Sequence, residues 1–290
     1  IATSGVPDRS VNIEWATDVA HMEIMGQTLN IQAIVLGANA SALASVTQAL
    51  YQSLSSPIVV LDRAEIEEIT TGCIPLEHVT ESWFLRHLRE SEKTWYEGFK
   101  RAMDILLAIP FGIASLLLLP LIALAIKCSS RGPVFYAQMR VGRGGCLIHI
   151  VKFRTMRVDA EVHGPQFTAS TKDDPRVTSV GRFLRQLRID ELPQVWNVLR
   201  GDLSFVGPRP ERPEFVAPLV KRMPYYALRH LARPGLTGWA QIRFLTPTAS
   251  LEDNLKKLQY DLFYIKHRSL MLDISILLKT IGIILRRQGT

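Results

Sequence analysis

Cysteine is scarce in this chain of 290 residues, and its copies lie far apart. Cys73, Cys128 and Cys146 each stand alone, without a neighbour at the spacing of a zinc-binding pair. They also give no disulfide framework, so we expect a reducing, cytosolic setting for the soluble part. The sequence begins at Ile1 without a signal-peptide pattern, which leaves open that it is a piece of a longer chain.

Several functional motifs are missing as well. There is no Gly-x-Ser-x-Gly sequence, which argues against a serine hydrolase, and the seven histidines show no metal-ligand spacing. No zinc finger, ribonucleoprotein aromatic motif or basic zipper is present, so we expect no nucleic-acid partner. The formal net charge of +7 then points to anionic lipid or to a phosphorylated small molecule.

One segment is free of charge and strongly apolar. Residues 105–126 are 22 consecutive uncharged residues. As a helix they would extend roughly 33 Å, enough to cross the hydrocarbon core of a bilayer. We therefore expect membrane lipid as a partner of this chain.

Two features of this segment argue against a simple crossing. Pro110 and Pro120 lie inside it, and each removes a backbone donor and favours a kink. Basic residues flank both ends, at positions 100–101 before it and at Lys127 and Arg131 after it. Since cytoplasmic flanks attract Lys and Arg, the pattern favours a re-entrant helix with both ends on the cytoplasmic face. A kinked spanning helix is the alternative.

The first 75 residues show the pattern of a partial, Rossmann-like β-α-β domain (1–75). Residues 31–36 and 57–62 are predicted as short buried strands, with a helix at 41–51 between them. Nucleotide-binding units of this kind use a Gly-rich turn, but only Gly37 stands where several glycines are expected. Whether the unit holds a ligand or is a structural remnant stays open, and it is compatible with a homo-oligomer.

The rest of the chain predicts a mixed α/β domain that is mostly helical with short strands. We expect a linker helix over residues 76–99 and a membrane-anchored domain over residues 100–290, with its membrane helix at 100–127. The predicted elements of this domain are strands at 132–136 and 147–153, helices at 176–200, 251–267 and 270–287, and a rigid proline-rich loop at 207–213. The last helix has an apolar body and a basic end, as interfacial helices do.

An acidic pair set among arginines is the candidate for chemistry. Asp190 and Glu191 are adjacent and follow Arg185 and Arg188. One carboxylate could attack phosphorus while its neighbour holds a hard cation such as Mg²⁺, which takes one or two carboxylates together with substrate phosphates. By spacing alone, a solvated ion pair with the two arginines is the commoner explanation.

Three groups of basic residues shift this balance toward a phosphate site. Guanidinium groups bind phosphate through paired hydrogen bonds, and a proline-rich loop holds such a residue at low entropic cost. Each group alone would be a solvated or lipid-facing surface, but three groups around one acidic pair favour phosphate binding. The groups are Lys152, Arg154 and Arg157; Arg182, Arg185 and Arg188 along one predicted helical face; and Arg209 and Arg212 in the loop.

Six motifs in a fixed order give the most specific signal. They are KRAMD at 100–104, GPVFYAQMRVG at 132–142, KFRTM at 152–156, RIDELPQVWNVLRGDLSFVGPRP at 188–210, RPGLTGWAQ at 233–241 and YDLFYIKHRSLMLD at 260–273. With them, the chain from about Lys100 to Arg287 resembles the bacterial sugar transferases, the monotopic phosphoglycosyl transferases that act as undecaprenyl-phosphate sugar phosphotransferases. The likeness is greatest to members tied to exopolysaccharide.

The resemblance implies a reaction and a place for it. The family transfers a sugar 1-phosphate from a UDP-sugar to undecaprenyl phosphate with Mg²⁺ and releases UMP, at the cytoplasmic face of the bacterial inner membrane. This step begins the assembly of exopolysaccharides or related glycans. The family's nucleophile, which forms a covalent phosphosugar intermediate, corresponds to Asp190. The neighbouring Glu191 is associated with Mg²⁺, and we expect both carboxylates at the metal.

Further residues are assigned in the same way. Phosphate binding in the family corresponds to Arg185 and Arg209, and we add Lys152 and Arg154 as substrate-phosphate ligands. The family's membrane element is a re-entrant helix broken at a proline, and Pro120 occupies the matching place as the membrane hinge.

Two departures from the family pattern leave questions open. Longer members carry four membrane-spanning helices ahead of a nucleotide-binding-like domain, of which this sequence shows only the partial unit. Residues 242–244 follow Gly-Trp-Ala-Gln where many members continue with Asn, so the sugar is open. Two other functions stand beside phosphosugar transfer: a membrane-bound glycosyltransferase that releases UDP, and a non-catalytic membrane scaffold.

Overall fold

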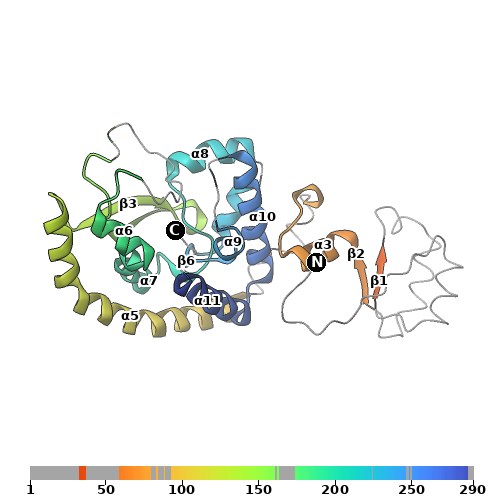
Figure 1. Cartoon of the computed structure of the whole chain (residues 1–290). Helices are drawn as coiled ribbons and strands as arrows, with labels where there is room; N and C mark the ends of the chain where they lie inside the picture. The colour runs from red at the N-terminus through yellow and green to blue at the C-terminus, as the bar shows by residue number, and fades with distance from the viewer. Residues whose placement is uncertain are drawn as a thin grey trace, which may run out of the picture. The chain divides into compact units, whose positions relative to one another are not determined.

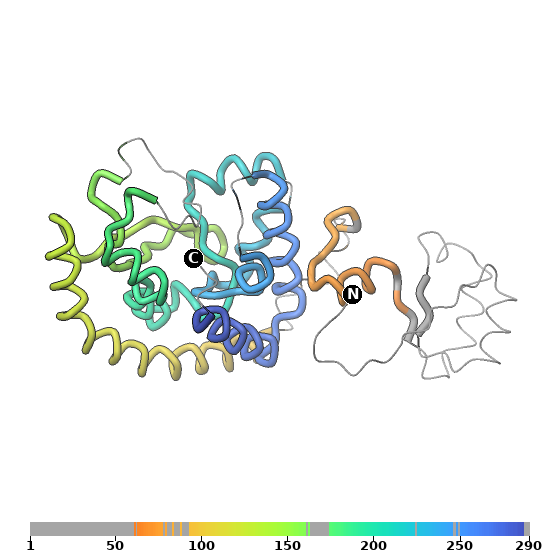
Figure 2. Tube along the Cα trace, viewed as in Figure 1, coloured from red at the N-terminus to blue at the C-terminus, as the bar shows by residue number. Residues whose placement is uncertain are grey.

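The computed structural model describes residues 33–36, 59–79, 83, 88, 93–160, 162, 174–223, 225–245, 248 and 250–286. The chain divides into two compact units, with the boundary between Thr71 and Gly72. Figure 1 shows the elements of each unit, and Figure 2 follows the same chain as a Cα trace. The larger unit contains the acidic pair and all three basic groups.

The smaller unit contains a two-stranded parallel sheet. β1 (Ala33–Leu36) pairs with β2 (Val59–Asp62), and α3 (Arg63–Thr71) follows β2 directly. Both strands lie within the segments predicted as strands, and parallel pairing is the arrangement that a β-α-β unit requires. The helix predicted between the strands and the lone Gly37 lie outside the described residues, so ligand binding by this unit stays a prediction.

The larger unit is built on one long apolar helix, α5 (Thr94–Ser129), of 36 residues. In Figure 1 it runs along the lower edge of the unit and then curves upward toward its C-terminal end. Pro110 and Pro120 lie inside the helix, and proline bends a helix axis by removing a hydrogen bond and crowding the preceding turn. The helix continues through Pro120 without a break, and the role of Pro120 as a membrane hinge stays a prediction.

α5 has the length and composition of a membrane helix. Its most apolar stretch has a mean hydropathy of 2.6, and only 6% of that stretch is buried against the rest of the protein. A core helix of a soluble protein would be mostly buried. The exposed apolar surface of α5 therefore favours contact with lipid.

Only part of the linker helix predicted over residues 76–99 lies within the described residues, so this helix stays a prediction. A short 3₁₀ helix, η2 (Leu76–His78), ends at Val79, whose backbone is extended. α5 begins at Thr94 and passes the expected boundary at residue 100 without a break, because no proline separates the two segments. The first turns of the membrane helix thus belong to the segment predicted as linker.

An antiparallel hairpin follows α5. β3 (Phe135–Val141) pairs with β4 (Leu147–Phe153) across the short turn η4 (Arg143–Gly145). β4 has the predicted bounds. β3 begins at Phe135 rather than at residue 132, because Gly132 has a φ of +124° and the proline after it cannot donate to a ladder.

The helix predicted over residues 176–200 is three elements in the structure. α6 (Ser179–Gln186), the 3₁₀ helix η5 (Ile189–Gln194) and α7 (Val195–Arg200) follow one another. The break comes at Arg188, whose φ of 57° is left-handed and is the only positive φ of a non-glycine residue within the described part of the chain. This break places the acidic pair on η5 rather than on a continuous helix.

The remaining elements form a second small sheet and a set of helices. β5 (Ser204–Val206) pairs in parallel with β6 (Gly235–Thr237). The two predicted C-terminal helices are confirmed as α10 and α11, and a serine side chain caps each N-terminus. The helices of this part are α8 (Pro213–Arg222), η6 (Tyr226–Leu231), α9 (Trp239–Arg243), α10 (Leu251–His267) and α11 (Leu270–Leu285).

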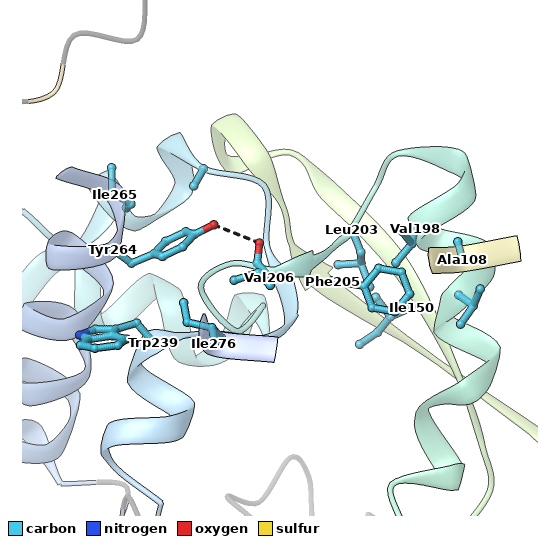
Figure 3. Close-up of a cluster of buried hydrophobic side chains, with 12 residues drawn as sticks. Ala108, Ile150, Val198, Leu203, Phe205, Val206, Trp239, Tyr264, Ile265 and Ile276 are labelled. Atoms are coloured by element: carbon cyan, nitrogen blue, oxygen red, sulfur yellow. Dashed lines mark hydrogen bonds between the residues drawn. The ribbon is translucent and has the colours of Figure 1, made fainter. Parts of the chain in front are cut away.

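The main core of the larger unit joins α5 to the β3–β4 and β5–β6 sheets. Figure 3 shows Ala108 of α5, Ile150 of β4 and Val206 of β5 in one buried cluster with Tyr264 and Ile276. The Tyr264 hydroxyl donates to the Val206 carbonyl at 3.3 Å. Burial of each large apolar side chain stabilises the fold by about 1.5–3 kcal/mol. The core thereby holds the strands near the acidic pair against the membrane helix.

A buried polar contact also fixes α5 in place. Lys100 Nζ lies 2.8 Å from Asp273 Oδ2 of α11, and the two side chains are 4% and 0% exposed. One turn later, Asp104 Oδ1 accepts hydrogen bonds from Ser204 Oγ and Phe205 N, both at 3.0 Å. Buried charges are costly unless they are paired, so these contacts specify one register of α5 against α11 and β5.

Candidate active site

The acidic pair lies where η5 packs against β4. Asp190 and Glu191 stand in the first turn of η5, directly after the left-handed Arg188. Lys152 reaches the pair from β4, where its backbone is fixed opposite Tyr136 of β3. The geometry of the site therefore depends on one turn and on one hairpin ladder.

Three cations surround the carboxylate of Glu191. Its Oε1 lies 2.8 Å from Lys152 Nζ, 3.2 Å from Arg209 Nη2 and 3.8 Å from Arg188 Nη1. Burial alone would raise the pKa of Glu191, but the three cations outweigh burial and hold this pKa well below its usual range. Glu191 is thus a permanent negative charge that gathers cations from three segments.

Asp190 has the opposite environment. It is 7% exposed, and its Oδ1 is buried without a hydrogen-bond partner. Burial, followed by the negative charge of Glu191, raises the pKa of Asp190 to about 6. The two neighbouring carboxylates therefore differ sharply, and Asp190 keeps an oxygen that no protein group occupies.

Arg185 precedes the acidic pair in the sequence, and Arg209 follows it. Arg185 Nε donates to Thr155 Oγ1 at 2.9 Å. Burial lowers the pKa of Arg185, and Asp190 is the strongest influence in the other direction. Glu191 raises the pKa of Arg209. The structure therefore gathers three predicted phosphate ligands, Lys152, Arg185 and Arg209, around the pair.

Tight glycine packing holds the loop that presents Arg209. Gly207 N donates to Thr237 O at 2.9 Å, which continues the β5–β6 pairing beyond β5. A Cβ atom at Gly207 would lie 2.2 Å from the Arg233 carbonyl oxygen, so a side chain there would push the two segments apart. Glycine is therefore required at this position.

A small pocket opens beside the pair. Its walls include Arg140, Lys152, Gln194, Arg209 and Gly235. Gln194 is 3% exposed, and its Nε2 has no hydrogen-bond partner. A buried amide without a partner is unusual in a protein interior, so it is suited to a ligand in the pocket. Sequence reasoning missed Gln194 and Arg140, although both lie within the motifs quoted above.

Arg154 lies at a different place from the other predicted phosphate ligands. Its Nη2 donates to the Ser130 carbonyl at 2.8 Å and to Ser130 Oγ at 3.0 Å, directly after the C-terminus of α5. A cation there stabilises the negative end of a helix dipole. Its contacts thus assign Arg154 to the end of the membrane helix, while a role in phosphate binding stays a prediction.

The prediction that three arginines lie along one helical face is wrong for the last of them, Arg188. α6 ends at Gln186, so Arg188 is outside the helix that contains Arg182 and Arg185. Arg212 contacts two neighbours in α8: its guanidinium lies 5.6 Å from the Phe215 ring centroid and 3.6 Å from Glu214. For Arg157, the structure gives a backbone hydrogen bond, which its N donates to Arg176 O.

The side chains of the site can be compared with the ligands that Mg²⁺ prefers. Within the described residues there is no cluster of three or more His, Cys, Asp or Glu side chains. Asp190 and Glu191 supply two carboxylates, and the unpartnered Asp190 Oδ1 shows that protein groups do not saturate the pair. Mg²⁺ takes one or two carboxylates when phosphate oxygens complete its coordination, so the pair fits Mg²⁺ in the presence of a phosphate substrate.

Comparison with known proteins decides the family. The description "Bacterial sugar transferase" matches residues 95–287, about two thirds of the chain. The chain belongs to the bacterial sugar transferase family. The acidic pair, the three cations around Glu191 and all of α5 except its first residue lie inside the matched region.

Individual relatives support the same family. A UDP-N-acetylgalactosamine-undecaprenyl-phosphate N-acetylgalactosaminephosphotransferase of Aeromonas hydrophila is 45% identical over 78% of this chain and 52% of its own length. A UDP-glucose:undecaprenyl-phosphate glucose-1-phosphate transferase of Xanthomonas campestris pv. campestris is 45% identical over 62% of this chain and 37% of its own. The exopolysaccharide production protein PSS of Rhizobium leguminosarum bv. phaseoli is 38% identical over 63% of this chain and 92% of its own length.

The chain covers different shares of the length of these relatives. The chain spans about half the length of the Aeromonas relative and about a third of the Xanthomonas relative. The Rhizobium relative, by contrast, is covered almost completely. Within this chain, the family description covers residues 95–287.

Gly207 offers a test of the loop geometry. We expect Gly207→Ala to lower the stability by about 1–3 kcal/mol, the usual effect of overpacking, because its Cβ would collide with the Arg233 carbonyl. The matched control is Gly98→Ala in α5, where no atom lies within 4 Å of the new Cβ and alanine is favoured in a helix by about 0.5–1 kcal/mol. Thermal unfolding in detergent measures both, and a Gly207→Ala protein as stable as the wild type would contradict the packing.

Proposed function

We propose that this chain transfers a sugar 1-phosphate from a UDP-sugar to undecaprenyl phosphate and releases UMP. A relative whose printed name describes an undecaprenyl-phosphate sugar phosphotransferase matches 78% of this chain, and the family description covers the acidic pair. The observation that supports the proposal best is the unequal environment of the pair. Glu191 is neutralised by cations, while the buried Asp190 keeps a carboxylate oxygen without a partner.

The first step uses this oxygen as a nucleophile. Asp190 Oδ1 attacks the β-phosphorus of the UDP-sugar, and a new O–P bond forms while the bond from that phosphorus to the bridging oxygen breaks. UMP leaves with the bridging oxygen and its electron pair, and a phosphosugar stays on the aspartate. Carboxylates form phosphoryl intermediates of this kind when they are ionised and poorly solvated.

The second step regenerates the aspartate. An oxygen of undecaprenyl phosphate attacks the same phosphorus, and the bond to Asp190 breaks with its electrons returning to the carboxylate. The product is a lipid diphosphate sugar. No proton is taken up in the bond exchange, so catalysis consists of positioning and of stabilising the negative charge on the phosphoryl oxygens.

The cations around the pair provide that stabilisation. Lys152 and Arg209 face Glu191 in the free protein, and Arg185 lies near Asp190. A diphosphate entering the pocket would exchange these contacts for its own oxygens. Arginine suits this task because its planar guanidinium binds two phosphate oxygens at once.

Mg²⁺ is the proposed cofactor. Asp190 and Glu191 would hold it, and it would neutralise the charge of the two phosphates when bound. Asp190 would thus serve both as metal ligand and as nucleophile, while Lys152, Arg185 and Arg209 orient the donor.

The donor sugar is proposed as N-acetylgalactosamine or glucose. Relatives with these two printed substrates have the same identity to this chain, 45%. The first match covers a larger share of the chain, which makes UDP-N-acetylgalactosamine the first donor to test. A place at the start of exopolysaccharide assembly is supported by the name of the Rhizobium relative.

We place the catalytic unit on the cytoplasmic face of the bacterial inner membrane. α6, α7 and α11 pack against α5, and each has large apolar side chains that are exposed to solvent. These side chains continue the apolar surface of α5 and fit an interfacial contact with lipid. They include Phe183 of α6, Trp196 of α7 and Met271, Leu278 and Leu285 of α11.

The re-entrant topology of α5 belongs to this proposal. Lys100 and Arg101 precede the apolar segment, and Lys127 and Arg131 follow it. α5 curves toward its C-terminal end (Figure 1), and a curved helix suits a topology in which both ends lie on one face of the membrane. Both basic flanks would then lie in the cytoplasm.

Product analysis of the wild type and of Asp190→Asn tests the function. Purified protein in nanodiscs with Mg²⁺, undecaprenyl phosphate and either UDP-sugar should release UMP. Asp190→Asn should lower turnover by about 10³-fold or more, because an amide does not form the intermediate, while its thermal unfolding stays at or above that of the wild type. Release of UDP would support a glycosyltransferase instead, and absence of any nucleotide product would support a scaffold.

The raised pKa of Asp190 predicts an acidic limb in the first step. Asp190 must be ionised to attack, and burial together with Glu191 raises its pKa to about 6. The rate of UMP release should therefore fall about tenfold per pH unit below pH 6.

Single-turnover UMP release without the lipid acceptor measures this limb, since it leaves out the titration of the acceptor phosphate. The same limb at about pH 4, where an ordinary aspartate titrates, would contradict the buried environment of Asp190.

A further inference from the structure

The loop that presents Arg209 is held by an unusual set of hydrogen bonds. Each of its four consecutive carbonyls, from Pro208 to Glu211, accepts one hydrogen bond from outside the loop. The donors are Gly235 N to Pro208 O at 2.9 Å, Arg229 Nη2 to Arg209 O at 3.0 Å, Arg140 Nη1 to Pro210 O at 3.1 Å and Val141 N to Glu211 O at 2.9 Å.

The prolines explain why outside donors are needed. Pro208 and Pro210 have no N–H group and a fixed φ, so the loop joins neither a helix nor a full strand ladder. Buried carbonyls still require partners. Two of them are supplied by backbone N–H groups, and the other two by arginine side chains. The position of Arg209 therefore depends on arginines that lie elsewhere in the sequence.

Glu211 fixes both of these arginines from within the loop. Its Oε1 lies 3.2 Å from Lys257 Nζ and 3.9 Å from Arg229 Nη1, and its Oε2 lies 4.0 Å from Arg140 Nη1. These cations outweigh the effect of burial and lower the pKa of Glu211 to about 2. Glu211 of the loop is thus the counter-ion of Arg140 and Arg229, the two arginines that donate to the loop carbonyls.

Arg229 is the more deeply buried of the two supports, with a side chain that is 4% exposed. Its Nη2 lies 2.8 Å from Asp261 Oδ2 of α10, and its Nη1 donates to the Tyr226 hydroxyl at 2.6 Å. One guanidinium therefore joins α10, η6 and the backbone of Arg209. A series of direct contacts runs from Asp261 through Arg229 and Arg209 to Glu191.

We propose that Arg229, held by Asp261 and Glu211, is a positioning residue that sets Arg209 for the donor diphosphate. The proposal rests on the proposed function, in which Arg209 binds a donor phosphate. Arg229 is not among the residues that line the pocket. Its effect on the reaction would then pass through Arg209, in contrast to a buried ion pair that only stabilises the fold.

A double-mutant cycle separates these roles. Arg229→Lys keeps the positive charge for Asp261 and Glu211, but one ammonium does not reproduce the planar fork that also reaches Arg209 O. We expect it to lower kcat/KM for the UDP-sugar about tenfold, a typical coupling between contacting residues. In an Arg209→Ala background the same change should lower kcat/KM by less than about twofold, since the group being positioned is gone.

The readout is single-turnover UMP release from UDP-N-acetylgalactosamine and from UDP-glucose, with the full chain in nanodiscs. Arg268→Lys is the matched control, because Arg268 is also buried and pairs with Glu97 at 3.1 Å. Its effect on kcat/KM should be the same with and without Arg209. Asp261→Asn, which keeps the size of the side chain, replaces Arg229→Lys in the cycle if the latter does not fold.

The outcomes are distinct. Equal effects of Arg229→Lys in both backgrounds would overturn the proposal and leave a purely stabilising ion pair. If Arg209→Ala alone leaves kcat/KM for both donors unchanged, the role of Arg209 in the proposed function is wrong, and the positioning role falls with it. A strong effect of Arg209→Ala with loss of the Arg229 effect supports both.

Discussion

The contact between Glu191 and its cations is the interaction on which the site depends. Lys152 comes from β4, Arg209 from the loop after β5, and Glu191 itself from η5. A single carboxylate therefore brings three segments together that are distant in sequence. In a buried position such a charge is stable only when it is paired, so the same interaction that assembles the site also excludes alternative arrangements. Asp190, one residue away, keeps its Oδ1 without a hydrogen-bond partner.

The membrane helix and the site are parts of one packing arrangement. Ala108 of α5 lies in the same buried cluster as residues of β4 and β5, and Lys100 pairs with Asp273 of α11. The strands that end near the acidic pair are thus fixed to α5, the helix whose length and composition suit a membrane. In the proposed reaction a soluble nucleotide sugar meets a lipid phosphate, so the reactive group needs a set depth. This packing would supply a rigid link between the site and α5.

Much of this arrangement could be predicted from the sequence, because the elements are local. The apolar period and serine caps define α10 and α11, and the ordered motifs identify Asp190 and Glu191. The break at Arg188 was not predictable, since a left-handed arginine has no local signal of the kind that glycine gives. Nor did the sequence show that Arg154 contacts the end of α5, because its neighbour Lys152 in the same motif reaches the acidic pair.

Trapping of the covalent intermediate tests the central claim most directly. The protein is incubated with Mg²⁺ and UDP-N-acetylgalactosamine or UDP-glucose in the absence of undecaprenyl phosphate, and its intact mass is measured. The account predicts an adduct of one sugar phosphate on the peptide that contains Asp190, one equivalent of UMP, and loss of the adduct when undecaprenyl phosphate is added. Release of UMP only in the presence of the lipid, with no adduct on the wild type, would contradict a nucleophilic Asp190.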